Sequence, residues 1–371
     1  MTQAIRLQEA AQEASHWLFE VAIPLWLERG VDWERGGYYD ALSFTGVENA
    51  SDFKRLRVTT RQIYVFAEAA RLGVSKAQAG AEHGLHFLRT NLRNSDGGFV
   101  ARTDLAGRVI DDTRDLYDLA FSLFAFAHGF RLLRDEDLRT EAVNLVDFIL
   151  ERLSHPCGGF QEALPSRLPR RQNPHMHLLE AALACSEHMG DAVFRTLSET
   201  LIELCILRFF DAKNSAIYEF FSDDLSEPLS VEGRKVTEPG HHFEWIWLFH
   251  EAERILDRGM PSVVELASST LRRGRDPVSG LLFGEVYDNG DVSQASVRLW
   301  PHTEWLKATL VSDHAGSPIE AWRALNSFLT PNGLWREVWN AEEQRFEEPA
   351  SPASSLYHIT VAVSELRRKV G

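Results

Sequence analysis

The sequence contains few of the residues that build disulfide or zinc frameworks. Its only cysteines are Cys157, Cys185 and Cys205, and none of them forms a CxxC pair. An odd number of widely spaced cysteines argues against both frameworks and favours a reducing compartment. The sequence also has no run of Lys or Arg, and its formal net charge is −15, which disfavours a nucleic-acid or membrane surface. We therefore expect a soluble cytoplasmic protein that binds a small, largely neutral molecule.

Other familiar patterns are absent as well. The N-terminal segment carries Arg6, Glu9 and Glu13 and lacks the apolar core of a signal peptide, and we expect no segment long enough to span a membrane. The Gly-Gly pairs do not form a GxGxxG loop between a strand and a helix, so a nicotinamide cofactor is not indicated. His175, His177 and the His241-His242 pair suggest a metal, but no HExxH motif or cysteine completes a zinc site. We expect neither metal nor cofactor.

What the sequence does contain is an internal repeat. Three short loops at 35–39, 96–99 and 157–160 each carry a Gly-Gly pair followed by an aromatic residue, and successive pairs are 61 positions apart. Weaker versions of this loop lie at 214–219, 279–283 and 332–335. Six related loops spread over the whole chain indicate a repeat architecture.

Helical patterns lie before and after each loop. The stripe of Val193, Leu197, Leu201 and Leu204 shows the helical period. The first helices of the six pairs are predicted at 4–29, 76–92, 138–154, 192–209, 261–274 and 317–329, and the second at 58–73, 113–133, 174–189, 240–257, 299–311 and 354–369. We predict an all-α (α/α)6 barrel of twelve helices, one domain over residues 1–371, with short β-hairpins in the loops at one end. An open solenoid is the alternative.

The first turns of the second helices share polar and aromatic groups. These groups are Arg61 and Gln62; Tyr117 and Asp118; His175, His177 and Glu180; His241, His242 and Glu244; Trp300, His302 and Glu304; Tyr357 and His358. If these helices form the inner ring of a barrel, their N-terminal ends meet around one cavity. An open array would scatter the same groups, so their chemistry favours closure.

Histidines, carboxylates and aromatic rings in one cavity suit a sugar. Two imidazoles can move a proton between adjacent carbons of an open-chain sugar, because imidazole titrates near neutral pH and can act as base and then as acid. We select His241 and His358 for this task. The competing interpretations are a cap or packing role for His241, a buried core role for His358 and a surface ion pair for Arg61. The matching positions of these residues in the repeat favour the functional roles.

Four motifs make the sequence similar to the N-acylglucosamine 2-epimerase superfamily over essentially its full length. They lie at 173–181 (NPHMHLLEA), 238–245 (EPGHHFEW), 298–304 (RLWPHTE) and 354–358 (SSLYH). The first motif and the ending 352–358 most resemble the mannose isomerase and sulfoquinovose isomerase branch. The resemblance implies a cofactor-free (α/α)6 barrel that interconverts an aldose and its 2-ketose through a cis-enediol.

The resemblance also implies residue roles. His358 would shuttle the proton between C2 and C1, and His241, steadied by Glu244, would open the ring and handle oxygen protons, although the two histidine roles could be exchanged. Arg61 and His177 would bind substrate oxygens. The remaining expected residues would line or brace the pocket: Glu180, Tyr117, Asp118, Trp300 and Glu304.

The expected function is interconversion of D-mannose and D-fructose, with D-lyxose and D-xylulose as a second pair, by a monomer or homodimer. Mannose is preferred to a sulfosugar because the sequence shows no basic residue that can be assigned to a sulfonate. His302 stands where related sequences commonly have Gln, which could alter hydroxyl selection. Alternatives are a sugar 2-epimerase of the N-acylglucosamine or mannose/glucose type, a sulfoquinovose isomerase, a sugar-binding protein, and a glycoside hydrolase using Glu244, Glu304 or Asp118.

Overall fold

The computed structural model describes residues 2–44, 51–341, 343–347 and 350–371, and within them the chain forms six helical hairpins. The outer helices are α1 (Gln3–His16) continued through a π turn by α2 (Ile23–Arg29), then α4 (Ala77–Phe87), α6 (Glu136–Arg152), α8 (Ala192–Leu204), α10 (Val264–Gly274) and α12 (Pro318–Asn326). The inner helices are α3 (Leu56–Arg71), α5 (Leu116–Leu133), α7 (Gln172–His188), α9 (Pro239–Leu256), α11 (Trp300–Val311) and α13 (Ser354–Val370). The six predicted pairs are confirmed, with ends that differ by a few residues.

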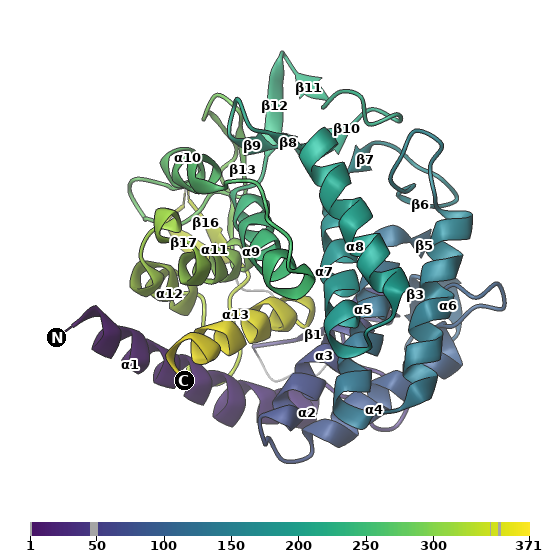
Figure 1. Cartoon of the computed structure of the whole chain (residues 1–371). Coiled ribbons are helices and arrows are strands. Elements are labelled where there is room, and N and C mark those ends of the chain that lie inside the picture. Colours follow the sequence, from purple (N-terminus) through teal and green to yellow (C-terminus); the bar gives the residue numbers. More distant parts are fainter. Residues whose placement is uncertain (1, 45–50, 342, 348–349) are drawn as a thin grey trace.

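The inner helices form a closed ring. Each one packs against the next, and the last, α13, packs against both α3 and the outer helix α1 (Figure 1). Each outer helix packs against the inner helix of its own or the neighbouring hairpin. The predicted (α/α)6 barrel is therefore correct, and the open solenoid is wrong.

One inner helix contradicts an expectation about membrane spans. The helix α5 is long and apolar enough to cross a membrane, with a mean hydropathy of 1.2 over its 18 residues. In the barrel, 78% of that stretch is buried. A helix surrounded by α3, α6 and α7 needs apolar residues on nearly all sides, and this requirement produces the same composition as a membrane span.

The six related loops share one backbone geometry. An antiparallel pair closes each of them: Val31 with Tyr38, Arg93 with Phe99, Ser154 with Phe160, Phe210 with Ile217, Arg275 with Leu282, and Leu329 with Trp335. In each loop, the residue two positions before the second member of the pair has a positive φ. These residues are Gly36, Gly97, Gly158, Ser215, Gly280 and Gly333. Glycine reaches this conformation without strain, which explains its recurrence; Ser215 is the exception.

This exception leads to a stability prediction. Ser215 has φ 51°, so Ser215→Gly should raise the free energy of unfolding by roughly 0.5–1 kcal/mol. The reciprocal control is Gly158→Ser, at φ 96° with no atom within 4 Å of an added Cβ, which should lower it by a similar amount. Urea titration followed by circular dichroism measures both. A stability loss in Ser215→Gly would contradict the prediction.

A short strand leads into each inner helix and fixes where the helix begins. These entry strands are β2 (Phe53–Arg55), β5 (Arg114–Asp115), β7 (Arg170–Arg171), β12 (Arg234–Thr237), β15 (Val297–Arg298) and β18 (Ser351–Pro352). In the same order, they pair antiparallel with β3 (Arg102–Asp104), β6 (Ala163–Leu164), β10 (Phe220–Phe221), β13 (Glu285–Tyr287), β16 (Val338–Asn340) and β1 (Ala41–Leu42), each of which follows one of the six loops. The predicted strands thus gather at the N-terminal ends of the inner helices.

Candidate active site

A cavity of about 270 Å³ opens at the N-terminal ends of the inner helices. Its volume lies near the lower end of small-molecule sites, which span roughly 300–1,000 Å³, and suits one monosaccharide. Seven of the ten predicted site residues line it: His241, His358, Glu244, Arg61, His177, Tyr117 and Trp300. The other three, Glu180, Asp118 and Glu304, stand behind and contact residues of the lining.

His358 is arranged as a neutral base. Its Nδ1 lies 2.9 Å from Oε1 of Glu304, whose other oxygen is 2.5 Å from the buried ammonium of Lys307. Burial lowers the pKa of His358 to about 3 despite this carboxylate. Burial opposes the ionisation of Glu304, but Lys307 and His358 outweigh it and lower the pKa of that carboxyl to about 2. The ionised Glu304 accepts the Nδ1 proton, so Nε2 of His358 keeps its lone pair.

His241 has the opposite protonation state. Its Nδ1 is 3.0 Å from Oε2 of Glu219 and 3.6 Å from Glu238. Burial disfavours the imidazolium, but the two carboxylates outweigh this cost and raise the pKa of His241 to about 10. At neutral pH the ring is therefore charged, and it can donate a proton to an oxygen in the cavity.

The expectation that Glu244 steadies His241 is wrong. The carboxylate of Glu219 contacts Nδ1 of His241 at 3.0 Å. The carboxyl group of Glu244 instead lies 3.7 Å from Nδ1 of His177. Both carboxyl oxygens of Glu244 are buried without a hydrogen-bond partner among the described residues. Burial and the nearby Glu304 raise the pKa of Glu244 well above the usual range, which favours its protonated form. In the cavity it can donate a hydrogen bond to a sugar hydroxyl.

Trp300 brings the two histidines to one place. The centroid of its ring lies 4.9 Å from that of His241 and 5.7 Å from that of His358. The Pro-Gly break before His241 makes this approach possible: Pro239 starts α9, and a Cβ on Gly240 would lie 2.5 Å from the Trp300 ring. The two imidazoles thus share one cavity with an aromatic wall between them.

A second set of contacts orients the cavity-lining side chains of α3, α5 and α7, which are Arg61, Tyr117 and His177. The guanidinium of Arg61 donates to the Tyr117 hydroxyl at 2.6 Å. The imidazole of His177 contacts Glu180 through Nδ1 at 3.1 Å, and Tyr357 donates its hydroxyl to the same carboxylate. Glu180 therefore lies behind His177 and contacts its ring through a hydrogen bond.

Sequence reasoning missed four arginines in the cavity lining: Arg55, Arg57, Arg171 and Arg298. Each makes an ion pair with a carboxylate, in that order Asp40, Asp118, Glu162 and Glu337, at distances of 2.6–3.1 Å. The sequence showed no basic residue that could be assigned to a sulfonate, whereas the structure places four arginines in the cavity lining. A signal was present, because three of these arginines stand one or two residues before an inner helix.

His302 does not reach the sugar cavity. It is fully buried, and its Nε2 accepts the backbone N–H of Leu282 at 3.0 Å. His175 and His242 hold the N–H groups of Phe160 and Ile217 in the same way, also at 3.0 Å. These three histidines fasten the related loops to the inner helices, so the suggested effect of His302 on hydroxyl selection is wrong.

Among the residues that the structure describes, three groups of His and Glu side chains could hold a metal ion, because the ligand atoms within each group lie within 4.8 Å of one another. The groups are His177, Glu180 and Glu244; Glu219, Glu238 and His241; Glu244, Glu304 and His358. In each group the histidine Nδ1 already faces a carboxylate. We expect catalytic turnover to persist after dialysis against EDTA, measured as sugar converted per minute. A loss that Zn²⁺ or Mn²⁺ restores would contradict this.

The comparison with known proteins agrees with this geometry. Residues 37–362 match the N-acylglucosamine 2-epimerase (GlcNAc 2-epimerase) family. The chain belongs to this family. The family and its similar members identify an enzyme that acts on sugars as an isomerase or epimerase.

Similar members of the N-acylglucosamine 2-epimerase family carry both kinds of activity in their names. The chain is 37% identical to a mannose-6-phosphate isomerase of Rhizobium meliloti (strain 1021), over 99% of this chain and 98% of the relative. It is 26% identical to a D-mannose isomerase of Thermobifida fusca, over 68% and 67%. The structure of cellobiose 2-epimerase from Spirochaeta thermophila DSM 6192 has the same fold, with a TM-score of 0.85, 23% identity and coverage of 98% and 97%.

Proposed function

We propose that this protein is an aldose-ketose isomerase that interconverts D-mannose and D-fructose through a cis-enediol, with D-lyxose and D-xylulose as a second pair. The observation that carries the proposal is the opposite protonation of two histidines in one cavity. His358 has a pKa of about 3 and is a free base, whereas His241 has a pKa of about 10 and is an acid. An enolisation needs both at once.

The reaction proceeds in two stages. During ring opening, His241 gives a proton to the ring oxygen and takes up the proton of the anomeric hydroxyl. His358 then removes the proton at C2 through Nε2, the C–H electrons form the C1–C2 double bond, and His241 protonates O1. Return of the proton from His358 to C1, with loss of the O2 proton to His241, yields the ketose. Glu304 stabilises the transient charge on His358 at 2.9 Å.

A 2-epimerase would use the same enediol but return the proton to the opposite face of C2. Incubation with D-mannose and chromatography of the products separates the two outcomes. We expect D-fructose. Accumulation of D-glucose alone would show that the protein is an epimerase.

A phosphorylated substrate is the second candidate function. Arg55, Arg57, Arg171 and Arg298 line the cavity with partly exposed side chains. The relative that is 37% identical is named mannose-6-phosphate isomerase. A guanidinium binds phosphate through charge-assisted hydrogen bonds. The paired carboxylates orient these arginines and reduce the net positive charge, which is why free D-mannose remains the first candidate.

The two candidates differ in how they respond to loss of Arg57. If the substrate is D-mannose 6-phosphate, Arg57→Gln should lower its kcat/KM by about 10–100-fold, the effect of one charged hydrogen bond. The same variant should leave kcat/KM for D-mannose within about threefold. Arg152→Gln, on the outer helix α6, is the matched control. Equal losses for both sugars would contradict phosphate recognition by Arg57.

A further inference from the structure

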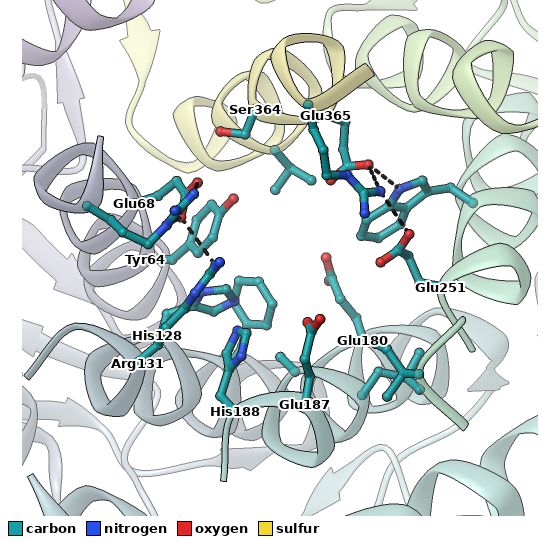
Figure 2. Close-up of a pocket in the computed structure, with 18 of the residues that line it drawn as sticks. Tyr64, Glu68, His128, Arg131, Glu180, Glu187, His188, Glu251, Ser364 and Glu365 are labelled. Carbon is teal, nitrogen blue, oxygen red and sulfur yellow. Dashed lines mark hydrogen bonds and ion pairs between the residues drawn. The ribbon is translucent and has the colours of Figure 1, made fainter. Parts of the chain in front are cut away.

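A second cavity, of about 570 Å³, opens at the opposite end of the barrel. It lies between the C-terminal halves of α3, α5, α7, α9 and α13, and none of its lining residues is among the described residues that line the sugar cavity. We call it the distal cavity and define it by Tyr64, His128, Glu180, His188, Trp247 and Ser364. Figure 2 shows five of these side chains around a central opening: Tyr64, His128, Glu180, His188 and Ser364.

The interior of the distal cavity combines aromatic walls with polar atoms that lack partners. Tyr64 and Phe124 pack on the ring of His128 with centroids 4.6 and 4.3 Å away, and His188 lies 5.2 Å from it. Neither imidazole makes a hydrogen bond to another described residue, although His128 is only 9% exposed. The hydroxyl of Ser364 is also buried without a partner. Buried polar groups are normally hydrogen-bonded, so the Ser364 hydroxyl is suited to an occupant, and the imidazoles of His128 and His188, which line the same cavity, can bind it as well.

The charged side chains around the distal cavity balance in number, with five carboxylates facing five guanidiniums: Glu68, Glu180, Glu187, Glu251 and Glu365; Arg71, Arg131, Arg254, Arg367 and Arg368. Glu68 pairs with Arg71 and Arg131, and Glu251 pairs with Arg254 and Arg368. Burial lowers the pKa of His128 well below its usual value and that of His188 to about 4, so both rings are neutral at pH 7. A neutral imidazole offers one donor and one acceptor. These features select an uncharged molecule rather than an anion.

Glu180 connects the distal cavity with the sugar cavity. Its carboxylate points into the opening in Figure 2 and also accepts hydrogen bonds from His177, at 3.1 Å, and from Tyr357. His177 lines the sugar cavity on the other side. A molecule that donates a hydrogen bond to Glu180 would therefore compete with the contact that positions His177.

We propose that the distal cavity is a second binding site, for an uncharged molecule with a hydrocarbon face and hydroxyl groups, and that its occupancy affects the sugar site through Glu180. The apolar face packs against Tyr64, Phe124 and Trp247. The hydroxyl groups satisfy His128, His188 and Ser364. Binding in the distal cavity does not depend on which sugar binds in the sugar cavity. The effect of this binding on turnover rests on the proposed isomerase function.

Titration of the full chain with 4-fluorophenol, followed by ¹⁹F NMR at pH 7, tests the binding site. A phenol with a pKa of about 10 is uncharged at this pH. We expect saturable binding to the wild type that D-mannitol, an open-chain polyol for the sugar cavity, does not displace. Ser364→Trp, which fills the distal cavity, should weaken binding at least tenfold. Ser75→Trp, on an exposed loop, should not.

His128→Phe provides a test that does not depend on how Ser364→Trp folds. It keeps the ring that packs on Tyr64 and Phe124 but removes both nitrogens, and it should also weaken binding about tenfold, the effect of a lost buried hydrogen bond. Displacement of the probe by D-mannitol, absence of saturation, or unchanged affinity in His128→Phe would each overturn the site.

Steady-state kinetics test the link through Glu180. Saturating 4-fluorophenol should change kcat for the sugar by at least twofold, because the occupant acts on the position of His177 and leaves the sugar cavity open. An increase in KM alone, with kcat unchanged, would indicate competition at the sugar cavity and overturn the link. Unchanged kcat and KM would overturn it as well. Absence of turnover on any sugar in the wild type would instead refute the proposed function, and the NMR result would stand.

Discussion

Replacement of His358 by Asn is expected to lower kcat for ketose formation by about 10²–10⁴-fold, the usual contribution of a general base. Asn retains a polar group of similar size beside Glu304 but cannot take up the C2 proton. His358 is 6% exposed, and its Nδ1 lies 2.9 Å from Glu304, the contact that leaves Nε2 free to act as the base. KM should change much less than kcat.

Proton exchange in D₂O distinguishes this role from a structural one. Wild-type enzyme should incorporate deuterium at C1 of the ketose or C2 of the aldose, and His358→Asn should abolish the incorporation while the circular dichroism spectrum stays unchanged. His250→Asn, an exposed histidine on α9, is the matched control. Retention of most turnover in His358→Asn would contradict the isomerase and favour the glycoside hydrolase, in which two carboxylates do the work.

The fold could be predicted because the sequence repeats one geometric requirement. In each loop, the residue two positions before the second member of the antiparallel pair needs a positive φ, which favours glycine. Gly36, Gly97 and Gly158 therefore recur at a fixed spacing and mark three of the hairpins in the sequence. Ser215 fulfils the same requirement without glycine, which is why that loop is difficult to recognise in the sequence. Closure of the ring could be predicted from the polar side chains in the first turns of the inner helices, because these side chains meet in one cavity only if the ring is closed.

The partner of His241 could not be predicted from local spacing. Glu244 is three residues away on the same helix, which favours a contact between neighbouring faces. Glu219, however, lies 22 residues before His241 in the sequence. It reaches His241 because its backbone is hydrogen-bonded to Gln172 at the start of α7 and to Val236 of β12, next to the start of α9. The contact between Arg57 and Asp118 is equally hidden in the sequence, because it joins residues 61 positions apart on two neighbouring inner helices.

Glu219 therefore controls the protonation state of His241. Burial alone would lower the pKa of this imidazole, and Glu219 is the largest of the influences that raise it to about 10. When the charge of Glu219 is removed, only Glu238, at 3.6 Å, still faces Nδ1 of His241. The lowering of the pKa by burial is then opposed less strongly. The pKa of His241 must then fall toward neutral pH, and the fraction of the protonated acid at pH 8 must fall with it.

Glu219→Gln is thus expected to move the alkaline limb of the kcat/KM profile to lower pH, with a loss of about 10–100-fold at pH 8 that is regained on acidification, because the lost acid catalysis is restored when His241 is protonated. A pH series from 5 to 9 measures the shift. Glu227→Gln, an exposed residue of the same loop, should keep the wild-type profile. A uniform loss at every pH would mean that Glu219 only orients the ring, since a structural effect does not follow the titration of His241.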